Sequence, residues 1–193
     1  MHGVKRLFAW MIPRFDPERF TVSLISLRGQ DESEDNLERF GIDVTYLGRG
    51  KFDPRTLPAL LRVLEGKQAD ILHMHGYGAT TFGRIAAAWR RTPTVLHEHA
   101  NLTSTPWFQQ VADELLLPFT DLAIAVSRST ADFVIQARRI PPNLTRVVYL
   151  GAPASEFGRV RTAGEVREAR AALGVPESCF AFGAVTRLMP SKG

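Results

Sequence analysis

The sequence has 193 residues, of which 45% are hydrophobic and 23% charged, and its formal net charge is +4. A chain of this length can form one good hydrophobic core, or one domain and part of another. No apolar run reaches the roughly 18 residues that a membrane-spanning helix needs, and the N-terminus lacks a signal-peptide layout. No basic run with interleaved aromatic residues indicates a nucleic acid partner. The modest positive charge leaves open a weak affinity for anionic membrane surfaces.

The single cysteine, Cys179, excludes an internal disulfide and fits a reducing compartment. Its place in the apolar run CFAF at 179–182 predicts burial rather than reactivity. We therefore expect a cytoplasmic protein.

Helical and extended patterns alternate through the first third of the chain. Apolar spacing predicts a helix over 3–12, a strand over 20–27, a short helix over 32–40 and a strand over 42–47. Asp53 followed by Pro54 indicates the start of a helix that continues to Gly66, with Asp53 as its N-cap.

The same alternation continues to the end of the chain. The patterns predict strands at 69–72, 94–96, 121–126, 146–150 and 180–185, and helices at 78–91, 106–117, 127–138 and 165–173. Ser127 or Ser129 can cap the helix at 127–138. This order indicates an α/β fold, a Rossmann-like parallel sheet with helices on both faces. We expect one domain over 1–155, and a linker with the start of a second domain over 156–193.

Four of the five histidines lie between residues 70 and 100, in two His-x-His pairs at 73–75 and 97–99. Because side chains alternate along a strand, each pair projects two rings to one face. A strand–helix–strand unit makes the two strands parallel neighbours, so both pairs meet where open α/β sheets bind ligands. The alternative for each single histidine is a loop residue bonded to the backbone. Two pairs at one edge favour a functional site.

The order of the motifs resembles the family 4 glycosyltransferases, two-domain enzymes of the GT-B fold. The motifs that carry the resemblance are GVKR at 3–6 with FDPERF at 15–20, DILHMHG at 70–76, PTVLHEH at 93–99, DLAIAVS at 121–127 and VTRLMPSKG at 185–193. His2, Leu150 and Pro153 depart from the family pattern, which has Gly, Asn and Asp there. The resemblance covers essentially the whole chain. It implies a fragment of a larger protein that lacks the first strand and most of the donor domain.

The resemblance also assigns roles to particular residues. His99 is the candidate catalytic histidine, and His75 and Gly76 are expected to line the acceptor cleft. The donor diphosphate is expected to bind a second group of residues: Gly3, Arg187 and Lys192. Cationic side chains can neutralise a leaving diphosphate, and a glycine lets backbone N–H groups approach a phosphate. For Arg187 and Lys192 the alternative is two solvated cations on a loop, and for Gly3 it is a simple turn.

The remaining residues of the histidine region have structural interpretations. His97 lies deeper in its strand and His73 is interpreted as packed or backbone-bonded. Glu98 points to the opposite face, where we expect an ion pair. The basic pair Arg138–Arg139 ends a predicted helix, where cations complement the helix dipole.

The resemblance implies a retaining transfer of a sugar from a nucleotide-diphosphate donor to a lipid-linked, glycan or small-molecule acceptor. It implies no metal ion and no other cofactor, and it places the protein in the cytoplasm or at the inner face of the membrane, with peripheral membrane association left open. This piece alone is expected to be inactive. Two alternatives remain. The chain is a non-catalytic domain of the same fold, or its two His-x-His pairs bind Zn²⁺ in a hydrolase.

Overall fold

The computed structural model describes residues 3–30, 36–50, 53–101 and 105–185. Contacts between residues divide the chain into two units, Met1–Gly151 and Ala152–Gly193, whereas the sequence placed the division after residue 155. Across the described ranges, no helix combines the length and hydropathy needed to cross a membrane.

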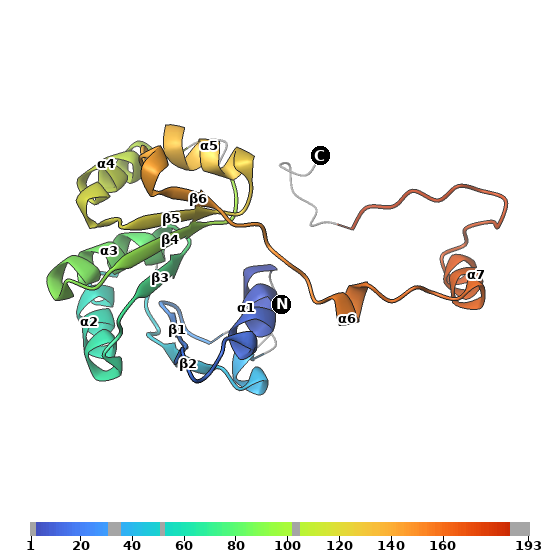
Figure 1. Ribbon diagram of the computed structural model, residues 1–193, viewed down its shortest axis with the longest axis horizontal. Helices are drawn as coiled ribbons and strands as arrows, with labels where there is room; N and C mark the ends of the chain where they lie inside the picture. Colours follow the sequence, from blue (N-terminus) through green and yellow to red (C-terminus); the bar gives the residue numbers. More distant parts are fainter. Residues whose placement is uncertain (1–2, 31–35, 51–52, 102–104, 186–193) are drawn as a thin grey trace. The chain divides into compact units, whose positions relative to one another are not determined.

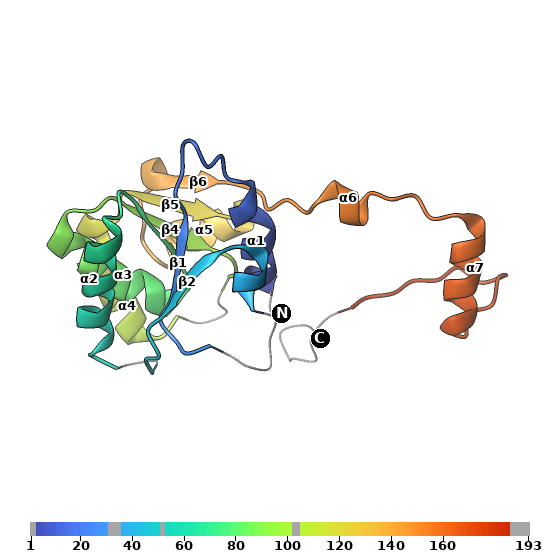
Figure 2. The same ribbon diagram turned by 90° about the horizontal axis from the view of Figure 1, so that it is seen from below.

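The strands of the first unit form two parallel sheets. One contains β1 (Ser23–Ser26) and β2 (Asp43–Tyr46), and the other contains β3 (Leu72–His75), β4 (Thr94–Glu98), β5 (Leu122–Ala125) and β6 (Thr145–Val147). The four strands of the larger sheet lie side by side in chain order (Figure 1). The two strands of the smaller sheet also lie side by side (Figure 2). The expected α/β class with parallel strands is confirmed.

Helices connect these strands as the apolar spacing predicted. They are α1 (Gly3–Met11), α2 (Thr56–Lys67), α3 (Tyr77–Arg90), α4 (Trp107–Leu115) and α5 (Arg128–Gln136). Ser127 is the N-cap of α5, and its Oγ accepts a hydrogen bond from the Thr130 N–H at 3.1 Å.

Two predicted helices near the N-terminus differ from the structure. Helix α2 begins at Thr56, so Asp53 is not its N-cap. The Asp53 carboxylate instead accepts the Arg55 N–H at 2.9 Å, in the turn that precedes the helix. Of the helix expected over 32–40, residues Leu37–Phe40 form a 3₁₀ turn, and 31–35 lie outside the described residues.

The two faces of the larger sheet carry different side chains. Leu96 of β4 is fully buried and packs in one cluster with Ala131 and Val134 of α5. Met74 of β3 lies on this same face, because it is paired in register with Leu96. The histidines alternate with these residues and therefore occupy the opposite face. There the ring of Phe8 in α1 meets the His75 ring edge-on, with centroids 4.7 Å apart.

Gly83 allows α3 to approach β3 closely. A Cβ atom at this position would overlap Met74 Sδ and lie 3.3 Å from Leu72 Cδ2. We expect Gly83→Ala to lower the free energy of unfolding by about 1 kcal/mol, because overpacking costs about 1–3 kcal/mol and better helix propensity returns up to about 1. Urea denaturation measures this change.

Gly66 provides the matched control, since it is a helical glycine with open space around its Cβ position. Gly66→Ala is expected to raise the free energy of unfolding by up to about 1 kcal/mol. Equal effects of the two substitutions would show that contact with β3 does not determine the residue at 83.

The second unit is described over 152–185 and contains α6 (Ala154–Phe157) and α7 (Ala163–Ala172). The strand predicted over 180–185 is wrong, because these residues form no strand and the side chains of Phe180 and Phe182 are more than nine-tenths exposed. A strand requires a neighbour to pair with, and the described part of this unit offers none. Cys179 is exposed, so its predicted burial is also wrong.

Candidate active site

Two neighbouring strands place the four histidines on one face of the larger sheet. In the register of β3 and β4, His75 is opposite His97 and Met74 is opposite Leu96. His73 and His75 share a face, as do His97 and His99, because side chains alternate along a strand. The two His-x-His pairs therefore meet at the carboxyl ends of β3 and β4, as the sequence predicted. We call these four residues the histidine array.

The rings of the array stack on one another and bond in two pairs. His73 Nε2 lies 3.1 Å from His97 Nδ1, and His75 Nδ1 lies 2.7 Å from His99 Nε2. The His97 and His99 rings stack with centroids 4.4 Å apart. His73 was predicted to be packed or backbone-bonded, and the structure supports the first, since its ring stacks on those of His75 and His97 and its hydrogen-bond partner is another imidazole.

The array is uncharged at neutral pH. Burial, together with repulsion from the neighbouring rings, lowers the pKa of His75 to about 2 and the pKa of His97 to about 3. Burial also lowers the pKa of His99 from its ordinary value. A neutral imidazole offers one N–H donor and one nitrogen lone pair, so each ring can accept a proton, pass one on or bind a cation.

A cavity of about 840 Å³ opens beside the array. His75 and Gly76, the residues predicted to line an acceptor cleft, are both in its wall. Gly76 has a φ of 81°, a conformation that L side chains rarely adopt, and it turns the chain from β3 into α3. The wall also contains apolar residues in and just after β1 and aromatic residues from other elements: Leu24, Leu27, Phe8, Tyr46, Tyr77 and Phe108. Polar side chains, among them those of Lys5, Arg28 and Asn36, line the rest. The cavity can take a ligand with a substantial apolar part.

The residues predicted to bind the donor diphosphate are only partly described. Gly3 is the first residue of α1, so its backbone lies in the first turn of a helix, where N–H groups are unbonded within the helix. Arg187 and Lys192 lie outside the described residues. Their expected role stays a prediction.

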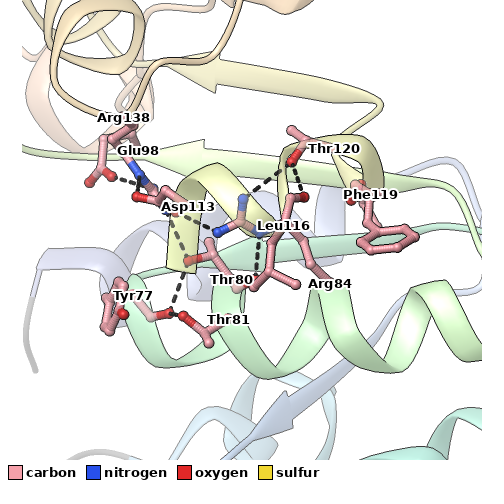
Figure 3. Close-up of polar contacts among 11 residues, drawn as sticks. Tyr77, Thr80, Thr81, Arg84, Glu98, Asp113, Leu116, Phe119, Thr120 and Arg138 are labelled. Atoms are coloured by element: carbon pink, nitrogen blue, oxygen red, sulfur yellow. Dashed lines mark hydrogen bonds and ion pairs between the residues drawn. The ribbon is translucent and has the colours of Figure 1, made fainter. Parts of the chain in front are cut away.

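A buried ionic network lies on the opposite face of the sheet, under α3, α4 and α5 (Figure 3). The Asp113 carboxylate pairs with both Arg84 and Arg138, and all three side chains are at most 1% exposed. Arg138 donates to Asp113 through Nε at 2.9 Å and Nη2 at 2.7 Å. It also donates from Nη1 to Glu98 Oε2 at 2.9 Å. Two guanidinium groups thus face two carboxylates.

This network reaches the histidine array through Glu98. The expected ion pair of Glu98 is confirmed, with Arg138 as its partner. The other carboxylate oxygen, Oε1, accepts the backbone N–H of His99 at 3.2 Å. Buried charges on α3 and beyond α5 therefore hold the chain at the point where His99 leaves β4.

Sequence reasoning missed Arg84 and Asp113 and misplaced Arg138. Arg138 is buried among carboxylates and does not act as an exposed cation at a helix end. One signal was available in α3. Arg84 lies with Gly83 and Ala87 on the face of α3 that is buried and carries mostly small side chains. A charged residue on a buried face requires a partner of opposite charge.

A comparison with models of protein families identifies the family of the chain. The model of glycosyltransferase family 4 matches residues 2–156. An Escherichia coli protein, UDP-Gal:alpha-D-GlcNAc-diphosphoundecaprenol alpha-1,3-galactosyltransferase, is 23% identical over 203 aligned positions that cover the whole chain. The chain spans about half of that relative, 52% of its length.

Solved structures share the fold at lower identity. A glycosyltransferase from Rickettsia africae has a TM-score of 0.72 and 15% identity, over 91% of this chain and 47% of that one. The Anabaena protein HepE in complex with UDP has a TM-score of 0.68 and 19% identity, over 90% of this chain and 47% of that one.

Proposed function

Because the chain belongs to glycosyltransferase family 4, we propose that it forms the acceptor-side part of an enzyme that moves a sugar from a nucleotide-diphosphate donor. The observation that carries the proposal is the contact of the cavity with the histidine array. His75 lines the cavity and is hydrogen-bonded to His99 at 2.7 Å. An acceptor hydroxyl in the cavity then lies within reach of a chain of neutral imidazoles.

Relatives support a uridine nucleotide as the donor and a lipid-linked acceptor. The E. coli relative is named for transfer from UDP-Gal to a diphosphoundecaprenol-linked sugar. HepE was solved with UDP-glucose as well as with UDP. An acceptor with a prenyl diphosphate anchor has a long apolar part, which agrees with the apolar and aromatic wall of the cavity. Such an acceptor would bring the enzyme to the inner face of a membrane from the cytoplasm.

Each proposed site residue has a distinct task. His99 donates a hydrogen bond to the reacting groups or carries the acceptor proton. Arg187 and Lys192, with the first turn of α1 at Gly3, neutralise the charge on the leaving diphosphate. Gly76 keeps the backbone between β3 and α3 close to the acceptor. The transfer retains the configuration of the anomeric carbon and requires no metal ion.

The test uses the full-length protein that contains this chain. It is incubated with radiolabelled UDP-galactose or UDP-glucose and a short-chain α-D-GlcNAc diphosphoprenol. We expect label in the extracted lipid, an α-linkage in the product by NMR coupling constants, and the same rate after treatment with EDTA. The isolated chain of 193 residues serves as the comparison and is expected to be inactive.

Three results would contradict parts of the proposal. Release of UDP without a glycosylated lipid would indicate hydrolysis, and a β-linked product would exclude retention. Failure to turn over UDP-sugars with lipid, glycan and small-molecule acceptors would support one of the two alternatives, a non-catalytic domain of this family.

A further inference from the structure

We infer that the histidine array contains a binding site for a divalent transition-metal ion of the zinc class, held by His73, His75 and His97. One nitrogen from each of these three rings lies within 4.8 Å of the other two. His75 also lines the cavity used in the proposed sugar transfer, but that transfer requires no metal ion, so metal binding is a further property of the array.

The spacing of the nitrogens suits such an ion. Zn–N bonds of about 2.1 Å in a tetrahedral site separate the ligand atoms by about 3.4 Å. His73 Nε2 and His97 Nδ1 are already 3.1 Å apart. His75 lies on the same face of β3 as His73, and its nitrogen is within 4.8 Å of the other two ligand atoms. Adjacent strands of a rigid sheet thus supply three ligands.

A second observation points to a ligand at this position. His97 is 5% exposed, and its Nε2 atom is buried with no hydrogen-bond partner in the described structure. A buried polar atom without a partner costs about 1–3 kcal/mol. His97 Nδ1 faces His73 Nε2, so an ion bound at Nδ1 leaves the N–H of the ring on Nε2, whereas an ion bound at Nε2 takes up the nitrogen that has no partner. His73 is the exposed member of the three, so an ion can enter from solvent past its ring.

The chemistry of the donors selects the class of ion. Three imidazole nitrogens suit Zn²⁺, Ni²⁺ or Cu²⁺, whereas Mg²⁺ and Ca²⁺ require oxygen ligands.

Cobalt provides the test, because tetrahedral Co²⁺ absorbs visible light where Zn²⁺ does not. Protein without an affinity tag is freed of metal, titrated with CoCl₂ and then with ZnCl₂, and followed by its absorption and by equilibrium dialysis. We expect one Co²⁺ per chain with a Kd below about 10 μM, displaced by one equivalent of Zn²⁺. The exposed His73 is the safest ligand to remove, and His73→Ala is expected to weaken binding at least tenfold.

A further histidine of the array serves as the control. His99→Ala is expected to leave the Kd within about threefold of the wild-type value, since His99 does not belong to the three ligands. His75→Ala repeats the test on a second ligand, and circular dichroism checks the fold of each variant. The inference is overturned if Co²⁺ does not bind at one per chain, if both ligand variants bind as the wild type does, or if His99→Ala loses binding as His73→Ala does. Sugar transfer is measured separately, and a failure of Co²⁺ binding leaves the proposed transfer intact, since that transfer requires no metal ion.

Discussion

Asp113→Asn is expected to lower the free energy of unfolding by about 3–5 kcal/mol, because it leaves two buried guanidinium groups facing one carboxylate. Arg84 and Arg138 both pair with Asp113, and Asp113 is 1% exposed. Burial alone already lowers the pKa of Arg84, which shows how unfavourable its charge is in this position. Asparagine has nearly the same shape as aspartate, so the change removes charge with little change in volume. Urea denaturation followed by circular dichroism measures the loss.

The adjacent residue of α4 is a matched control. Glu114 pairs with Arg139 at 3.1 Å, but both side chains are more than 60% exposed. Glu114→Gln is therefore expected to change the free energy of unfolding by no more than about 1 kcal/mol. A loss for Asp113→Asn no larger than that for Glu114→Gln would mean that the buried network does not stabilise the fold.

The buried network also shows which features of the fold could not be predicted from the sequence. Apolar spacing predicted the strands and helices of the first unit, because periodicity reports which face of an element is buried. Strand alternation places the two rings of each His-x-His pair on one face, and the strand–helix–strand unit brings the two pairs to the same edge of the sheet. Asp113 and Arg138, however, meet across α4 and the end of α5, 25 residues apart. No local pattern encodes that pairing, so the sequence predicted only a cation at the end of a helix for Arg138.

The strand expected over 180–185 failed for the complementary reason. Phe180, Phe182 and Val185 alternate with small residues in a run that favours extended backbone. Local preference cannot supply the neighbouring strand that a sheet requires. The described part of the second unit provides no such neighbour, and these side chains are exposed. The candidate site has the same limit, because the roles predicted for Arg187 and Lys192 rest on motif resemblance and not on contacts in the structure.

His99→Ala in the full-length enzyme is expected to lower kcat/KM at least tenfold, which corresponds to about 1.4 kcal/mol of barrier. His99 is held from two sides, by the 2.7 Å contact of its ring with His75 and by the bond from its backbone N–H to Glu98. Alanine keeps the backbone bond and removes the only part of the residue that can exchange a proton. Arg187→Ala is expected to have an effect of similar size through the leaving diphosphate. Steady-state kinetics with the UDP-sugar and the prenyl acceptor measures both.

A double-mutant cycle distinguishes direct catalysis by His99 from support of its neighbour. If His99 only orients His75, then His75→Ala alone reproduces the full loss, and adding His99→Ala has no further effect. If His99 acts on the substrate, His99→Ala lowers kcat and His75→Ala mainly raises KM for the acceptor, because His75 lines the cavity. Glu114→Gln is the control with unchanged kinetics. Near-normal turnover in both His99→Ala and Arg187→Ala would refute the roles assigned to these residues.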